Sequence, residues 1–247
     1  MTDYDEYSLN TKEKITFYSL WFSGAMILGN LFYESTVAGF LLTLPGFLAK
    51  KLYEEYLVES RKRELSYQFR DLLYSLSASV AAGHQMAQAL MEAENSMALI
   101  YDENALILKE LRHISFSIRE VRESDEVLLR DLGMRSGLED IRDFSQVYSI
   151  CRRTGSGLEE AINKASEVLM DKIDVKREIH TITAQKKMEV RILILLPLML
   201  IVILKLISPG YLDVMYHSIQ GRVIMTVALL GMVFAIIISS KLTKVEL

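Results

Sequence analysis

The sequence contains few of the residues that build catalytic, metal or disulfide sites. Its 247 residues include one cysteine, Cys151, which excludes an internal disulfide framework. The four histidines, His84, His113, His180 and His217, lack the spacing of metal ligands. No GxxxxGK[ST], HExxH or CxxC motif occurs, and no pattern places a nucleophile beside a base. The sequence therefore predicts neither an enzyme nor a bound metal or other cofactor.

Proline is also scarce. Pro45, Pro197 and Pro209 are the three in the chain, and none lies between the first two. A proline ring removes a backbone donor, so its absence over this length permits long continuous helices. From residue 53 to residue 189, apolar residues recur at three- and four-residue steps, as in the series Leu72, Leu73, Leu76 and Val80. No stretch alternates with period two for long enough to predict a strand, so an all-α fold is expected.

Basic residues are not in excess. The 28 lysines and arginines face 32 acidic residues, and a net charge of −4 gives no electrostatic footprint for nucleic acid. The hydrophobic fraction of 51% and the mean hydropathy of +0.20 are nevertheless high for a soluble protein. Both observations fit one chain because its charges concentrate in residues 50–191. This segregation predicts a membrane protein with a hydrophilic central domain.

Apolar runs predict about four transmembrane helices, arranged as two pairs. The runs are residues 15–33, 36–49, 192–208 and 223–240. A spanning helix needs roughly 17–25 mainly apolar residues. The second run is short, but Lys50 and Lys51 can extend towards the interface and lengthen its reach. Buried core helices rarely have more than about 14 uninterrupted apolar residues, which disfavours a globular alternative.

The distribution of lysine and arginine predicts the orientation. Most of those near the segment ends fall on one side: Lys12, Lys14, Lys50, Lys51, Arg61, Lys62, Arg63, Lys186, Lys187, Arg191, Lys241 and Lys244. The other side has Arg222 and, near the boundary, Lys205. By the positive-inside rule, both termini and the central domain are expected to be cytoplasmic, in the inner membrane. The predicted parts are a cytoplasmic segment (1–14), a transmembrane hairpin (15–49), a cytoplasmic bundle (50–190), a transmembrane pair (191–240) and a cytoplasmic tail (241–247).

Six helices are predicted in the central domain. Their approximate ranges are 53–82, 84–96, 104–123, 126–132, 138–153 and from 158 into the third crossing. Gly83 and Gly155 are expected to end helices, and Arg152 and Arg153 to lie favourably near a helix C-terminus. The repeated Ser-Gly-Leu-Glu at Ser136 and Ser156 predicts two capping boxes. For the last helix a coiled coil is the alternative to a bundle helix, although its heptad spacing is not sustained.

Several charged and proline positions suggest contacts with lipid or partners. Arg61, Lys62 and Arg63 could bind anionic lipid or an acidic protein surface. Glu189 and Arg191 flank the membrane boundary, either as interfacial anchors or as a polar joint between domain and membrane helices. Lys205 is expected to extend to the boundary, and Pro197 to kink the third crossing.

Several motifs together resemble the F domain of type II secretion systems. They are Gln68–Leu73, Leu76-Ser77, Ala81–Gly83, Ala89-Leu90, Arg153–Gly155 with Leu158 and Ala161, Ala184–Arg191, Pro197, Ser208–Tyr211 and Gly221. Two crossings before a single F domain and two after it are similar to the TadB-like branch of tight-adherence (Flp) pilus systems. His84 and the Lys186–Met188 junction depart from the usual form.

The resemblance implies an oligomeric, non-enzymatic platform at the inner membrane beneath a growing pilus. The partners it implies are a hexameric secretion ATPase, a second F-domain protein of the TadC type, pilin subunits and membrane lipid, with no role for nucleic acid. Candidate partner or coupling positions are Arg61, Lys62, Arg63, Gly83, Arg152, Arg153, Gly155, Glu189, Arg191, Pro197 and Pro209. The alternative is a membrane-anchored helical signalling or scaffold protein, although the predicted outer loops are too short for a sensor domain.

Overall fold

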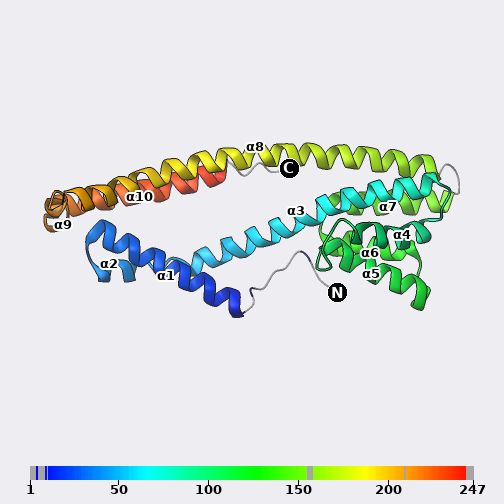
Figure 1. Cartoon of the computed structure of the whole chain (residues 1–247), viewed down its shortest axis with the longest axis horizontal. Helices are drawn as coiled ribbons and strands as arrows, with labels where there is room; N and C mark the ends of the chain where they lie inside the picture. Colours follow the sequence, from blue (N-terminus) through cyan, green and yellow to red (C-terminus); the bar gives the residue numbers. More distant parts are fainter. Residues whose placement is uncertain (1–3, 5–8, 10, 155–157, 209, 243–247) are drawn as a thin grey trace. The chain divides into compact units, whose positions relative to one another are not determined.

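The computed structural model describes residues 4, 9, 11–154, 158–208 and 210–242. Within these residues all regular elements are helical, as the sequence predicts (Figure 1). The chain divides into two units, which we call the bundle unit (Met1–Ser8 and Glu54–Arg177) and the membrane unit (Leu9–Tyr53 and Glu178–Leu247). The long helices α3 (Gly46–Ala81) and α8 (Leu158–Ile207) contribute residues to both units.

The six helices expected in the central domain are all present. Between α3 and α8 lie α4 (Met86–Ala98), α5 (Leu106–Phe116), α6 (Asp125–Ser136) and α7 (Glu139–Thr154). A π-helical turn, η1 (Ser117–Val121), extends α5. The last helix continues without a break into the apolar run, and Pro197 lies inside it. The predicted helix ends differ from the observed ones by a few residues, except that α3 begins earlier and α6 ends later.

The core of the bundle unit forms where the apolar stripes of these helices meet. On α3 the buried apolar side chains are Leu65, Phe69, Leu72, Leu73, Leu76 and Val80, spaced so that they share one face. Phe69 contacts Phe144 of α7 edge to face, with ring centroids 5.8 Å apart. On α8, Ile162, Leu169 and Ile173 are buried in the same core. This packing supports a bundle helix over a coiled coil for the first part of α8.

Glycines end two helices of the bundle. Gly83 has φ +88°, its N–H donates to Val80 O at 2.9 Å, and the His84 N–H donates to Ser79 O at 3.2 Å. This pair of bonds is the Schellman arrangement, which favours glycine at the left-handed position. The prediction that a helix breaks at Gly83 is therefore confirmed. Gly137, with φ +59°, ends α6 in the same left-handed conformation.

The capping box predicted at Ser136 is wrong in its details. Ser136 is the last residue of α6, and its hydroxyl donates to Gly133 O at 3.1 Å. The same oxygen accepts from the Leu138 N–H at 3.2 Å instead of from the amide three residues along. Because the left-handed Gly137 turns the chain, the Ser136 hydroxyl bonds a carbonyl at the end of α6 and an N–H just before α7. The second predicted box, at Ser156, and Gly155 lie outside the described residues.

Three helices in the described residues are long and apolar enough to cross a membrane. They are Thr11–Tyr33, which is α1, Ile162–Ile207 within α8, and Ile219–Ile238 within α10 (Ile219–Leu242). The second apolar run, residues 36–49, was expected to complete the four crossings, but it does not form a single helix. α2 (Thr36–Leu41) ends early, and α3 starts only after Pro45. Proline is favoured at a helix start because its missing N–H would be unpaired there.

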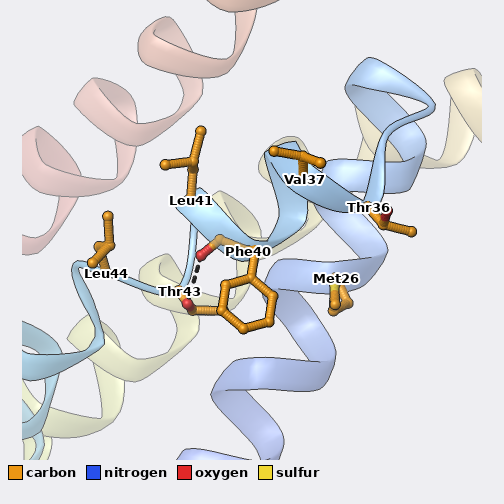
Figure 2. Close-up of a pocket in the computed structure, with 7 residues that line it drawn as sticks. All are labelled: Met26, Thr36, Val37, Phe40, Leu41, Thr43 and Leu44. Atoms are coloured by element: carbon orange, nitrogen blue, oxygen red, sulfur yellow. Dashed lines mark hydrogen bonds between the residues drawn. The ribbon is translucent and has the colours of Figure 1, made fainter.

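The interrupted segment nevertheless follows α1 in the antiparallel direction. Gly29 of α1 faces Gly39 of α2, the Trp21 indole N–H donates to Thr43 O at 3.2 Å, and Phe17 stacks on Tyr53 at 5.1 Å. Figure 2 shows the two segments side by side at Met26 and Phe40. Trp21 thus satisfies a carbonyl in the non-helical stretch, as an apolar surrounding requires. The return path covers most of the length of α1 in two helical pieces.

We expect Gly29→Ala to destabilise this hairpin while Gly24→Ala does not. A Cβ on Gly29 would lie 2.2 Å from Gly39 Cα and N, so the backbones would have to separate. Overpacking of this kind costs about 1–3 kcal/mol. A Cβ on Gly24 meets nothing within 4 Å, and alanine is the better helix former. Thermal unfolding of the detergent-solubilised variants checks the difference, and equal midpoints would contradict the close approach.

Candidate functional site: the ion pairs that hold α8 to the bundle

A buried carboxylate on α7 anchors α8. Lys172 Nζ lies 2.9 Å from Asp140 Oδ1, and Lys176 Nζ lies 3.0 Å from Asp140 Oδ2. The two lysines are four residues apart on α8 and therefore share a face. Asp140 is 1% exposed and lies in the first turn of α7, where the helix dipole favours a negative charge. One carboxylate thus ties two successive turns of α8 to the start of α7.

A second set of contacts ties α8 to α3. Arg70 Nε lies 2.7 Å from Asp174 Oδ1, and Arg70 also pairs with Asp71 at 2.9 Å. The Tyr101 hydroxyl donates to Asp71 Oδ2 at 2.5 Å, and its burial, together with Asp71, raises the pKa of Tyr101 to about 12. Arg177, the last α8 residue of the bundle unit, lies 5.6 Å from the Tyr67 ring centroid.

We call the four α8 residues of these contacts, Lys172, Asp174, Lys176 and Arg177, the α8 clamp. They fall within two turns of α8, directly before the residues that belong to the membrane unit. The sequence prediction missed the clamp. Alternating charges on a helix usually indicate a solvated face, and nothing in the sequence pairs them with Asp140 or Arg70.

Arg152 and Arg153 lie in the last turn of α7, as predicted, and contact carboxylates at the start of α6. Arg152 pairs with Asp125, which also accepts from the Tyr148 hydroxyl at 2.8 Å. Arg153 lies 3.2 Å from Glu126. The Ser149 hydroxyl donates to Glu126 at 2.6 Å, and this bond, with Arg153, holds the pKa of Glu126 below its ordinary value. These arginines join α7 to α6 and lie apart from the α8 clamp.

Arg61, Lys62 and Arg63 are partly buried on α3. The Arg61 guanidinium lies 4.9 Å from the ring centroid of Tyr4, which is itself buried. The Tyr4 hydroxyl donates to Glu110 at 2.8 Å, and both burial and that carboxylate raise the pKa of Tyr4. Part of the predicted basic patch therefore holds an aromatic residue from before the first membrane helix. The sequence prediction missed Tyr4 because a lone residue in a polar stretch has no periodicity.

The predicted boundary residues do not join the α8 clamp. Glu189 pairs with Lys186 at 3.0 Å, both on α8, and Arg191 is exposed. Pro197 lies inside α8, and Pro209 lies outside the described residues. Glu189 thus forms a local ion pair along α8. This pair is compatible with either predicted role, an interfacial anchor or a polar joint between the domain and the membrane helices.

Lys205 has a partner that the sequence prediction did not identify. Its Nζ lies 3.0 Å from Glu34 Oε1 and 5.5 Å from the Tyr216 ring centroid. Tyr216, in α9 (Asp213–His217), donates its hydroxyl to Leu31 O at 2.8 Å. The expectation that Lys205 simply extends to the boundary is therefore incomplete, since the lysine joins α8 to the turn after α1 within the membrane unit.

One cluster combines residue types found in hydrolases. His84 Nδ1 lies 2.8 Å from Glu92 Oε2, and the Ser79 hydroxyl donates to the same oxygen at 2.8 Å. In a catalytic relay the histidine lies between the acid and the nucleophile. Here the same histidine nitrogen, Nδ1, faces both Glu92 and the Ser79 hydroxyl, which lies 3.1 Å away, so the ring does not lie between acid and nucleophile and the cluster braces the turn between α3 and α4. The described residues also contain no group of three or more potential metal ligands.

Comparison with known proteins identifies the family to which this sequence belongs. The family model for protein F of the type II secretion system (T2SS) matches residues 72–204, which include the α8 clamp and most of α8. No curated protein and no solved structure matches the chain. Because the matched segment spans more than half of the 247 residues, the chain belongs to the type II secretion system protein F family.

Proposed function

We propose that this protein is the platform of a tight-adherence (Flp) pilus assembly machine, in which α8 couples the helical bundle to the membrane helices. The family is associated with non-catalytic platform proteins of the inner membrane in secretion and pilus systems. The three long apolar helices agree with a membrane protein. The pilus type, the coupling to an ATPase and the TadB-like role are our proposals.

The observation that carries the proposal is the continuity of α8. The helix runs from Leu158 to Ile207 and is held in the bundle by the α8 clamp. A helix transmits displacement along its axis better than a flexible linker does. Movement imposed on the bundle would therefore reach the apolar part of α8. Energetic coupling of this kind requires a physical element that both ends bias, and we propose that α8 is that element.

The partners follow from this role. We propose that a hexameric secretion ATPase engages the bundle, that a second F-domain protein of the TadC type completes the platform, and that pilin subunits contact the membrane helices. The excess of lysine and arginine at one end of the apolar runs supports a cytoplasmic bundle and cytoplasmic termini. The same cations would contact anionic lipid headgroups. We also propose that the chain forms an oligomer, which would match the symmetry of a hexameric partner.

Co-purification tests the proposal. The tagged chain is extracted from its native membranes in detergent, and the captured proteins are identified by mass spectrometry against an untagged control. Recovery of a secretion ATPase, a second F-domain protein or pilin is expected. Recovery of a kinase or receptor in their place would support a signalling scaffold and would remove the platform role.

A further inference from the structure

A groove crosses the surface of the bundle unit between α4 and α8, with α3 as its floor. Two adjoining hollows form it, of about 710 Å³ and 940 Å³. They share three residues: Tyr74 and Ala78 of α3 and Met170 of α8. The Tyr74 side chain is 72% exposed at this junction. The groove is therefore continuous over α3, with an accessible aromatic side chain at its centre.

The helices give the groove the shape of a helix-binding site. Tyr74, Ala78 and Ala81 follow at helical spacing, so the floor beyond Tyr74 consists of small side chains. One wall is the α8 stripe Glu160, Asn163, Lys164, Glu167 and Met170. The smaller hollow is lined instead by Ser96 and Met97 at the end of α4 and by the 63%-exposed Ile100 just after it. The two hollows meet along α3, and a low floor beside helical walls is the surface on which an amphipathic helix lays its apolar face.

The charged residues around the groove are predominantly acidic. Four carboxylates line the two hollows: Asp71, Glu92, Glu160 and Glu167. The two cationic lining residues are already engaged, Arg70 with Asp71 and Asp174, and Lys164 with Glu167. Glu92 contacts Ser79, Gln88 and His84, and no lysine or arginine of the described residues pairs with Glu160. A partner with positive charge would complement both ends of the groove.

We propose that this groove binds an amphipathic helix of a partner protein, with small or medium apolar residues on one face and lysine or arginine on its flanks. Tyr74 and Ile100 would contact the apolar face, and Glu92 and Glu160 would pair with the flanking cations. The assignment rests on the surface of the bundle unit alone and does not depend on the pilus role.

The test uses the full chain in nanodiscs of zwitterionic lipid and two labelled model helices. One peptide has an alanine- and leucine-rich face with lysine flanks, and the other has glutamate in place of each lysine. Fluorescence anisotropy is expected to show at least about tenfold tighter binding of the lysine peptide, with affinity falling as salt rises. Empty nanodiscs measure binding to lipid alone. Equal affinity for both peptides, or binding no stronger than to empty nanodiscs, would overturn the proposal.

Variants locate the binding. Ala78→Trp fills the floor and is expected to weaken binding of the lysine peptide at least about tenfold, as for a blocked central contact. Ala98→Trp, an equal change at an exposed position of α4 outside the groove lining, should leave the affinity for this peptide unchanged. Glu160→Lys should weaken binding of the lysine peptide and strengthen binding of the glutamate peptide. Unchanged binding of the lysine peptide to both Ala78→Trp and Glu160→Lys would overturn the proposal.

Discussion

Replacing Ala184 and Gln185 with a flexible Gly-Ser insert is expected to abolish pilus assembly without removing the protein from the membrane. The two residues lie in α8 beyond the α8 clamp, in the stretch that precedes the apolar run. Glycine costs a helix interior about 1 kcal/mol per residue, so several in succession interrupt it. The apolar runs themselves stay intact, so membrane insertion should be unaffected. Only the mechanical connection proposed for α8 is removed.

Electron microscopy of surface pili and immunoblotting of the membrane fraction measure the two outcomes separately. The matched control is an insert of about seven residues built from Ala, Glu and Lys at the same place, which adds about two helical turns and restores nearly the same face. This control should retain partial piliation because it lengthens α8 without making it flexible. Normal piliation with the flexible insert would show that α8 serves only as an anchor. Loss of piliation with both inserts would show that the length of α8 matters more than its stiffness.

The helices of the bundle could be predicted because each has a clear apolar period and few breakers. Leu72, Leu76 and Val80 share a face in the sequence, and the structure buries all three. Gly83 was predictable for a different reason, since a left-handed helix end favours glycine almost uniquely. Predictions of this kind depend on interactions between residues a few positions apart, which a single sequence displays directly.

The contacts between distant residues could not be predicted in the same way. Asp140 and Lys176 are separated by 36 positions, and Lys205 and Glu34 by far more. A carboxylate in the first turn of a helix looks the same in sequence whether water or two lysines surround it. The return segment after α1 was misjudged because hydropathy reports apolar length and does not register a change of backbone direction before Pro45. The short helix α9 was likewise missed, since five residues hold little periodicity.

Asp140→Ala is expected to be the most damaging single substitution among the charged residues that hold α8 to the bundle. The carboxylate is buried and accepts from two lysines, and breaking a buried pair costs about 3–5 kcal/mol. Lys172 and Lys176 are 36% and 27% exposed at their side chains, so both can partly regain water. We therefore expect a loss near the lower end of that range, about 3 kcal/mol.

Hydrogen exchange of the full chain, followed by mass spectrometry, measures this loss where it occurs. A local destabilisation of about 3 kcal/mol should accelerate exchange of the first α7 amides and of α8 around the α8 clamp roughly 100-fold. Glu139→Ala is the matched control, because its carboxylate lies next in sequence and contacts the same Lys172 at 3.3 Å but is 64% exposed. An exposed pair contributes about 0–1 kcal/mol, so exchange there should change less than about fivefold. Similar acceleration in both variants would show that burial of Asp140 adds nothing to its hold on α8. A large effect confined to Asp140→Ala would establish that the connection between α7 and α8 depends on this carboxylate.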